Sequence, residues 1–189
     1  MNNRVILCMI LSLAAAVPFL ERAQAAGLDA SAPEAAQILR ETGTTGGLAV
    51  HVGCGDAGLA GALARDSRLL VHALAARRET AAAARRHLMD AGLQDRVTVH
   101  HWQGRRLPYP DGLVRLLVVE TLPENPEKEI PRVLCPGGLA VIRRDLPVAL
   151  SPAREQHRFA VGENWIAYRN PGPDTHDEWT HYLYDATNN

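Results

Sequence analysis

The residues best placed for chemistry form a glycine-rich segment at positions 51–58, which reads His-Val-Gly-Cys-Gly-Asp-Ala-Gly. It follows an apolar run and opens a stretch with helical periodicity, so we expect a turn between a strand and a helix. Glycines in such a turn let the backbone approach a ligand, and the free amides of the helix attract polar groups. Gly53, Gly55 and Gly58 also satisfy Gly-x-Gly-x-x-Gly, so a nicotinamide cofactor stays open, as does a tight turn that binds nothing.

Two further sets of side chains could do chemistry. Cys54 and His51 would make a nucleophile as a thiolate–imidazole pair, although side chains at a strand end and in its turn need not meet. His100 and His101 end a later apolar run, where they are either metal ligands or ordinary strand-end residues. The chain has no Gly-x-Ser-x-Gly sequence, which excludes a serine hydrolase of that type.

The C-terminal segment 174–185 is rich in histidine, acidic and aromatic residues. His176, Asp177 and His181 are candidate metal ligands, but their spacing matches no common site. Aromatic side chains such as Trp179 favour the alternative of an interaction segment, because they need a surface to cover.

Strands alternate with helices along the chain. Buried strands are expected at 48–52, 69–74, 97–102, 113–120 and 139–143, and helices at 58–66, 77–91 and 125–134. Ser31 and Glu34 form a capping box that predicts the start of an additional first helix. This alternation predicts an α/β three-layer sandwich with a mostly parallel sheet, and the link between the third and fourth strands is too short for a crossover helix.

Three motifs, in a characteristic order and spacing along the chain, make this fold prediction more specific. The segment 51–58 is followed by Leu-Pro-Tyr-Pro-Asp-Gly at 107–112 and by Glu-Ile-Pro-Arg-Val-Leu-Cys-Pro-Gly-Gly at 129–138. Their order and spacing resemble the class I S-adenosylmethionine (SAM) dependent methyltransferases of the small-molecule type, over roughly residues 30–145. The resemblance implies a Rossmann-like fold with two more strands as an antiparallel C-terminal hairpin. One of these is visible at 164–169, so the full hairpin is not expected.

The resemblance also implies where the methyl donor and the acceptor would bind. The glycine turn would face the methionine part of SAM, Ala75 would face the ribose, and Arg105 the adenine. Glu120 would face the methyl acceptor and is the candidate catalytic residue. The implied cofactor-binding set is His51, Gly53, Cys54, Gly55, Asp56, Gly58, Ala75, Gly104 and Arg105.

Three of these positions depart from the family pattern. His51, Ala75 and Arg105 stand where the family has acids, and Ala57 stands where it usually has glycine. A lost charge-assisted hydrogen bond costs about 1.5–3 kcal/mol, so we predict that SAM binds weakly or not at all. The alternative function is a non-catalytic scaffold or interaction module. Ala75 counts against the nicotinamide cofactor as well, because that site needs an acid there.

The N-terminus has the layout of a secretory signal. A basic residue, Arg4, precedes an apolar stretch at 5–20, which is too short to span a membrane, and Ala23-Gln24-Ala25 fits a cleavage site. We therefore expect a signal peptide at 1–25, a methyltransferase-like domain at 26–150 and a tail or linker at 151–189. Export to the periplasm or beyond would separate the domain from SAM, which is made in the cytosol.

Composition and the tail bear on partners. The net charge is −1, with 20 basic and 21 acidic residues, which argues against a nucleic-acid binder. Cys54 and Cys135 lie in no metal-type spacing, which excludes a zinc finger and a disulfide scaffold. Residues 177–189 resemble the junction before a β-propeller in large exported bacterial proteins of the PQQ-binding-like type. The expected partner is therefore either a small-molecule methyl acceptor or a propeller domain, with no membrane span after cleavage.

Overall fold

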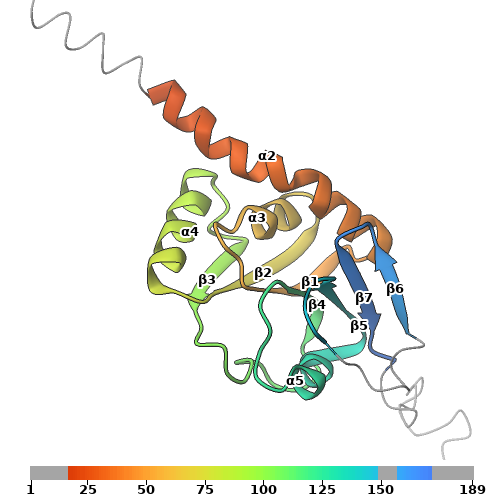
Figure 1. The fold of residues 1–189 in the computed structure, drawn as a ribbon. Helices are drawn as coiled ribbons and strands as arrows, with labels where there is room; N and C mark the ends of the chain where they lie inside the picture. The colour runs from red at the N-terminus through yellow and green to blue at the C-terminus, as the bar shows by residue number, and fades with distance from the viewer. Residues whose placement is uncertain (1–16, 149–156, 172–189) are drawn as a thin grey trace, which may run out of the picture.

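The computed structural model describes residues 17–148 and 157–171, which form one seven-stranded sheet with helices on both faces (Figure 1). The strands are β1 (Gly46–Val52), β2 (Arg68–Ala75), β3 (Val97–His101), β4 (Val114–Val119), β5 (Leu134–Arg143), β6 (Arg158–Val161) and β7 (Trp165–Arg169). The helices are α2 (Val17–Thr42), α3 (Gly58–Arg65), α4 (Arg78–Asp90) and α5 (Pro126–Val133).

The strand order is β3-β2-β1-β4-β5-β7-β6. Strands β1 to β5 are mutually parallel, whereas β7 pairs antiparallel with both β5 and β6. The order reverses direction between β1 and β4, which is where open α/β sheets bind their ligands. The predicted α/β three-layer fold with a mostly parallel sheet is confirmed.

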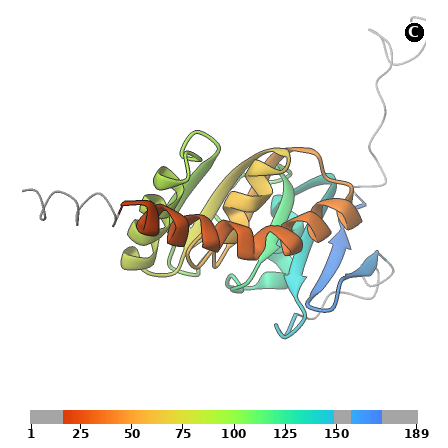
Figure 2. The ribbon, with the colours of Figure 1, turned by 90° about the horizontal axis from the view of Figure 1, so that it is seen from above.

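Two apolar cores lie on the two faces of the sheet. Helices α2, α3 and α4 cover one face, where small residues such as Ala62 and Ala84 allow close packing against the strands (Figure 2). The other face is covered by α5 and by the link 102–113, which contributes Trp102, Leu107 and Tyr109. That link contains no helix, as its length predicts.

Helix α2 differs from the expectation at its start. It is continuous through Ser31 and Glu34, so Ser31 is not an N-cap and the predicted capping box is wrong. The Glu34 carboxylate instead accepts a hydrogen bond of 2.7 Å from the Trp165 indole nitrogen. Glu41 accepts a second bond, from the backbone amide of Gly162. The helix therefore holds the C-terminal hairpin to the body of the domain.

The hairpin itself is complete. The strand expected at 164–169 is β7, and β6 supplies the second strand that the sequence did not reveal. The expectation of a shortened hairpin is therefore corrected. The sheet continues past residue 150, where the sequence analysis ended the domain, and takes in residues 158–169 of the segment expected to be a tail.

Several predictions lie wholly or largely outside the described residues. They are most of the signal peptide, the candidate ligands His176, Asp177 and His181, and the propeller-like junction at 177–189. Helix α2 runs through the predicted cleavage site at 23–25. Within residues 17–148 and 157–171, no helix combines the length and the apolar character that a membrane span requires.

Candidate functional site

The strand order brings the residues of the predicted site to one edge of the sheet. His51, Ala75 and Glu120 lie at or next to the carboxyl ends of β1, β2 and β4, and Gly104 and Arg105 follow β3. The carboxyl ends of β3, β2, β1 and β4 are adjacent in that order, and we call this the carboxyl edge. The topology thus places all the predicted positions along one side of the molecule.

The first part of the glycine turn is packed against the sheet. Gly53 has φ +88°, and a Cβ added there would lie 2.9 Å from the backbone nitrogen of Thr121 and closer to its hydroxyl. The amides of Gly53 and Cys54 both donate to the Leu74 carbonyl, at 2.8 and 3.1 Å. These two amides therefore tie β1 to β2, and glycine is required at Gly53 by both backbone angle and space.

The second part of the turn opens outward. Gly55 has φ +51° and no atom lies within 4 Å of a Cβ added there. The Asp56 carboxylate accepts a 2.9 Å hydrogen bond from the Gly58 amide at the start of α3. Ala57, at the position where the family usually has glycine, takes a left-handed φ of 65°. A ligand could reach this part of the backbone without displacing a side chain.

His51 and Glu120 form a pair in the middle of the carboxyl edge. His51 is only 1% exposed, and its Nε2 lies 2.7 Å from Oε1 of Glu120, whose side chain is 29% exposed. Its other ring nitrogen, Nδ1, is buried without a hydrogen-bond partner. The candidate catalytic residue and the residue that replaces the family's first acid are thus in direct contact, and the histidine orients the carboxylate.

The other two departures leave the positions after β2 and β3 without the predicted acids. Ala75 is buried at the end of β2, and its carbonyl accepts from the Trp102 amide. A methyl group cannot accept the hydrogen bonds of ribose hydroxyls. Arg105 is exposed, and the neighbouring Gly104 carbonyl is bonded to the Glu124 amide. The glycine turn between β1 and α3 is present, whereas Ala75 and Arg105 supply no carboxylate after β2 and β3.

Cys54 is not placed to act as a nucleophile. Burial raises the pKa of its thiol from 9.0 to about 12, so the thiolate is absent at neutral pH. The imidazole of His51 is bonded to Glu120 instead. Cys54 and Cys135 are both free thiols in the structure.

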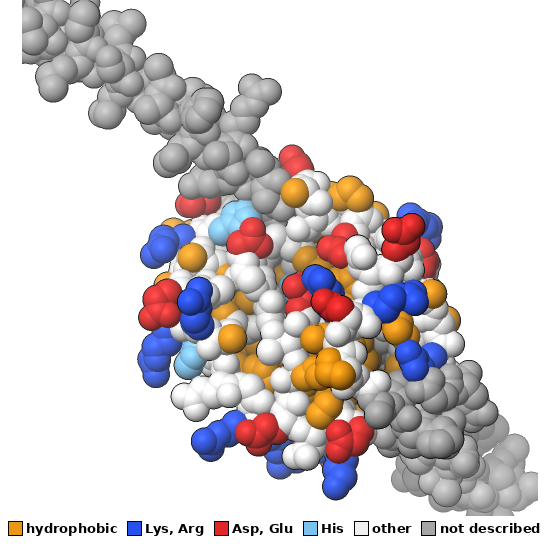
Figure 3. All heavy atoms as spheres, viewed as in Figure 1, with side chains coloured by type: hydrophobic (Ala, Val, Ile, Leu, Met, Phe, Trp, Pro, Cys, Tyr) orange, Lys and Arg blue, Asp and Glu red, His pale blue; other side chains and the backbone are white. Residues whose placement is uncertain are grey.

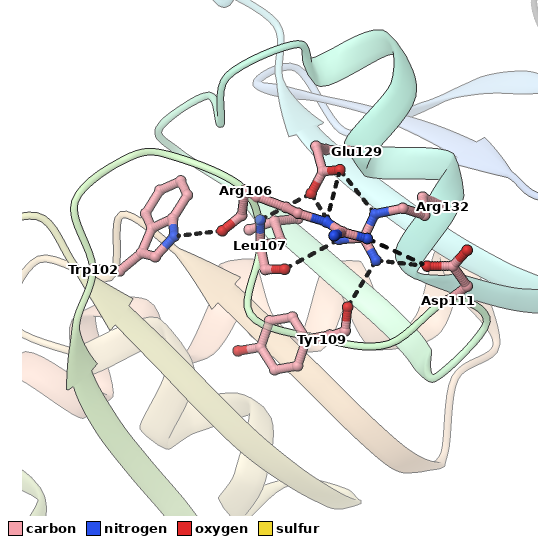
Figure 4. A network of polar contacts seen from close by, with 7 residues as sticks. All are labelled: Trp102, Arg106, Leu107, Tyr109, Asp111, Glu129 and Arg132. Carbon is pink, nitrogen blue, oxygen red and sulfur yellow. Dashed lines mark hydrogen bonds and ion pairs between the residues drawn. The ribbon is translucent and has the colours of Figure 1, made fainter.

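A network around Arg132 locks two of the sequence motifs together (Figure 4). Arg132 donates to both carboxylate oxygens of Glu129, at 2.8 and 2.7 Å, and to Asp111 and the carbonyls of Leu107 and Tyr109. Glu129 in turn accepts from the Leu107 amide at 2.9 Å. The motifs at 107–112 and 129–138 are therefore one structural unit, which no spacing argument revealed.

A second polar cluster joins β2, β3 and the link that follows β3. His72 Nε2 is 2.5 Å from His100 Nδ1, and the Tyr109 hydroxyl is 2.8 Å from His72 Nδ1. From the sequence, His100 was expected to act only with its neighbour His101. The register of β2 and β3, which spacing along the chain does not reveal, places His72 and His100 diagonally on the same face.

Known structures share this fold. A candidate SAM-dependent methyltransferase from Methanococcus maripaludis has a TM-score of 0.57 at 24% identity, over 67% of this chain and 61% of that one. Geranyl diphosphate C-methyltransferase from Streptomyces coelicolor, with Mg²⁺, geranyl diphosphate and S-adenosyl-L-homocysteine, has 0.52 at 20% over 58% and 44%. A geranyl diphosphate methyltransferase in complex with SAM has 0.52 at 21% over 59% and 48%. The chain has the class I methyltransferase fold.

The similarity lies in the fold. No protein-family model matches the chain, and no curated protein sequence matches it. The chain spans between 44% and 61% of the length of the three methyltransferases above. The SAM, S-adenosyl-L-homocysteine and geranyl diphosphate named above are ligands of those methyltransferases.

Proposed function

We propose that this chain is a SAM-dependent methyltransferase-type domain that binds its methyl donor weakly. The observation that carries the proposal is the contrast along the carboxyl edge. The glycine turn keeps the backbone shape of a donor site and is open at Gly55, whereas Ala75 offers no acceptor to a ribose. Structures of the same fold have been solved with SAM or S-adenosyl-L-homocysteine, which supports a donor at this edge.

The pair of His51 and Glu120 is the polar group nearest to where an acceptor would lie. Glu120 is partly exposed, and its Oε1 is held by the buried imidazole. A fixed carboxylate can orient a hydroxyl or amine by accepting its hydrogen bond. We propose that Glu120 contacts the acceptor and that His51 positions Glu120.

Calorimetric titration with SAM tests the proposal. We expect a dissociation constant above about 100 µM, because the acids that bind the ribose and adenine are replaced. The variant Ala75→Asp restores a ribose acceptor and should lower that constant by about tenfold. Ala76→Asp adds the same charge at the exposed neighbouring position and is the matched control, expected to change nothing. If the wild type, Ala75→Asp and Ala76→Asp all release or absorb no heat with millimolar SAM, the proposal that this domain binds SAM is wrong.

The replaced acids favour one alternative, a non-catalytic module that uses the fold as a scaffold before a propeller-like partner. The absence of SAM binding together with continuation of the reading frame into four-stranded repeats would support it. Export is part of both proposals. Sequencing the N-terminus of the protein recovered from its native host tests export, and we expect it to begin at Ala26.

A further inference from the structure

One cluster of metal-ligating side chains has no place in the proposed methyl transfer. It consists of His72 on β2, His100 on β3 and Tyr109 in the link after β3. His72 and His100 lie on the face of the sheet that the link 102–113 covers in part, beside the exposed side chains of Leu70 and Thr98. His100 is therefore open to solvent and borders the carboxyl edge, whereas His72 lies three residues before the end of β2.

The two imidazoles aim nitrogens at each other. His72 Nε2 and His100 Nδ1 are 2.5 Å apart, and the rings meet edge to face, with an angle of 82° between their planes. For this contact to be a hydrogen bond, one of the two nitrogens carries the proton and the other accepts it with its lone pair. Each nitrogen is a ligand that suits zinc, copper and nickel, whereas magnesium and calcium prefer oxygen.

Tyr109 fixes the orientation of the more buried ring. Its hydroxyl lies 2.8 Å from His72 Nδ1. The Tyr109 ring packs edge to face against the His72 ring. With the proton on Nδ1, His72 donates to the Tyr109 oxygen and presents the lone pair of Nε2 toward His100. A hydrogen bond at the far nitrogen is the arrangement that orients metal-binding histidines.

The two rings differ in how freely they can move. His72 is partly buried and is held by Tyr109. His100 is exposed, so its ring can move. Two nitrogen ligands of one metal ion stand about 3 Å apart. The two histidine nitrogens, now 2.5 Å apart, would therefore have to separate by only a fraction of an ångström.

We propose that His72 and His100 bind one divalent transition-metal ion of the zinc or copper class. Two imidazole nitrogens supply the protein ligands, and water completes the coordination from the open side of the sheet. Within residues 17–148 and 157–171, no group of three or more histidine, cysteine, aspartate or glutamate side chains could hold a metal. The site is therefore a two-ligand, exchangeable one.

Zinc titration of the full chain by calorimetry tests the site. His72→Gln and His100→Gln should each lower the zinc affinity at least about tenfold, since even loss of a supporting residue costs that much. His101→Gln removes the adjacent histidine of the same strand and should leave the affinity unchanged. Circular dichroism of each metal-free variant shows whether it is folded, and only folded variants are compared.

Copper provides a second measurement and separates the candidate sites. Electron paramagnetic resonance of the Cu²⁺ form should show two nitrogen ligands in the wild type and fewer in His100→Gln. The double variant of His176→Gln and His181→Gln should retain both nitrogens and the zinc affinity. Loss of binding in that double variant, or unchanged binding in both His72→Gln and His100→Gln, would overturn the proposal.

Discussion

His51 Nε2 lies 2.7 Å from Glu120 Oε1, so a hydrogen bond joins the ends of β1 and β4 across 69 residues of sequence. The pair sits where the strand order reverses, next to the glycine turn. Glu120 directly follows β4, so the histidine on β1 holds an acid at the end of the neighbouring strand.

Replacing Glu120 should destabilise the fold. Glu120→Ala leaves His51 buried with neither ring nitrogen bonded, because Nδ1 already lacks a partner. An unsatisfied buried polar group costs about 1–3 kcal/mol, which is the loss expected in the free energy of unfolding measured with urea. Glu120→Gln keeps an acceptor oxygen and should lose less. Glu124→Ala, at an exposed position, is the control. If Glu120→Ala and Glu124→Ala lose the same free energy of unfolding, the prediction is wrong.

Alanine should be tolerated differently at the two glycines of the turn. Gly53→Ala combines a left-handed backbone with a clash against Thr121, so we expect a loss of about 2–4 kcal/mol. Gly55→Ala has the left-handed backbone alone and should lose about 1–2 kcal/mol. Urea unfolding of both variants measures the difference, and equal losses would show that Thr121 does not restrict this position.

The elements were predictable where the local pattern is strong. The alternating apolar runs placed five strands and three helices within a few residues of β1 to β5 and α3 to α5. Strand β6 was not predicted because it is four residues long and partly exposed, with an apolar run of only three residues. The start of α2 escaped because a capping box is only a local signal, and Glu34 is satisfied by Trp165, far away in the sequence.

The site could be located from sequence but not its contacts. Strand ends in a parallel sheet share one edge, so the positions at the carboxyl edge followed from the alternation of elements. The contacts of His51 with Glu120 and of His72 with His100 depend on strand order and register. Neither leaves a trace in the spacing of the residues. Charge also gave little local guidance, because acidic and basic side chains are interspersed on the surface shown in Figure 3.

Removing Arg132 should be among the most costly substitutions. Its side chain is 14% exposed and that of Glu129 is 12% exposed, so Arg132→Ala leaves a partly buried carboxylate with only the exposed Arg106, 3.7 Å away, as a cation. Breaking a fully buried ion pair costs about 3–5 kcal/mol, so for this partly buried pair we expect a loss of about 3 kcal/mol in the free energy of unfolding. Arg132→Lys keeps the charge but loses the paired geometry of the guanidinium. Its free energy of unfolding should therefore lie between those of the wild type and Arg132→Ala.

Arg106→Ala provides the matched control for Arg132. Arg106 is 71% exposed and approaches Glu129 only to 3.7 Å. An exposed pair of this kind contributes about 0–1 kcal/mol, so chemical unfolding should barely distinguish the variant from the wild type. If Arg106→Ala and Arg132→Ala unfold at the same urea concentration, the network of Figure 4 does not brace the two motifs.

The same network predicts how stability depends on pH. Hydrogen bonding to Arg132 lowers the pKa of Glu129 below its ordinary value of 4.5. The unfolded state therefore binds a proton at a higher pH than the folded state. This contribution to stability is complete above about pH 5 and is lost as the pH falls through the lowered pKa of the folded state.

Unfolding in urea between pH 6 and pH 3 measures this dependence. Glu129→Gln cannot ionise, so it should be less stable than the wild type near neutral pH and lose less stability on acidification. Glu124→Gln removes an exposed carboxyl and should retain the slope of the wild type. Equal slopes for Glu129→Gln and the wild type would place the acid sensitivity elsewhere in the chain.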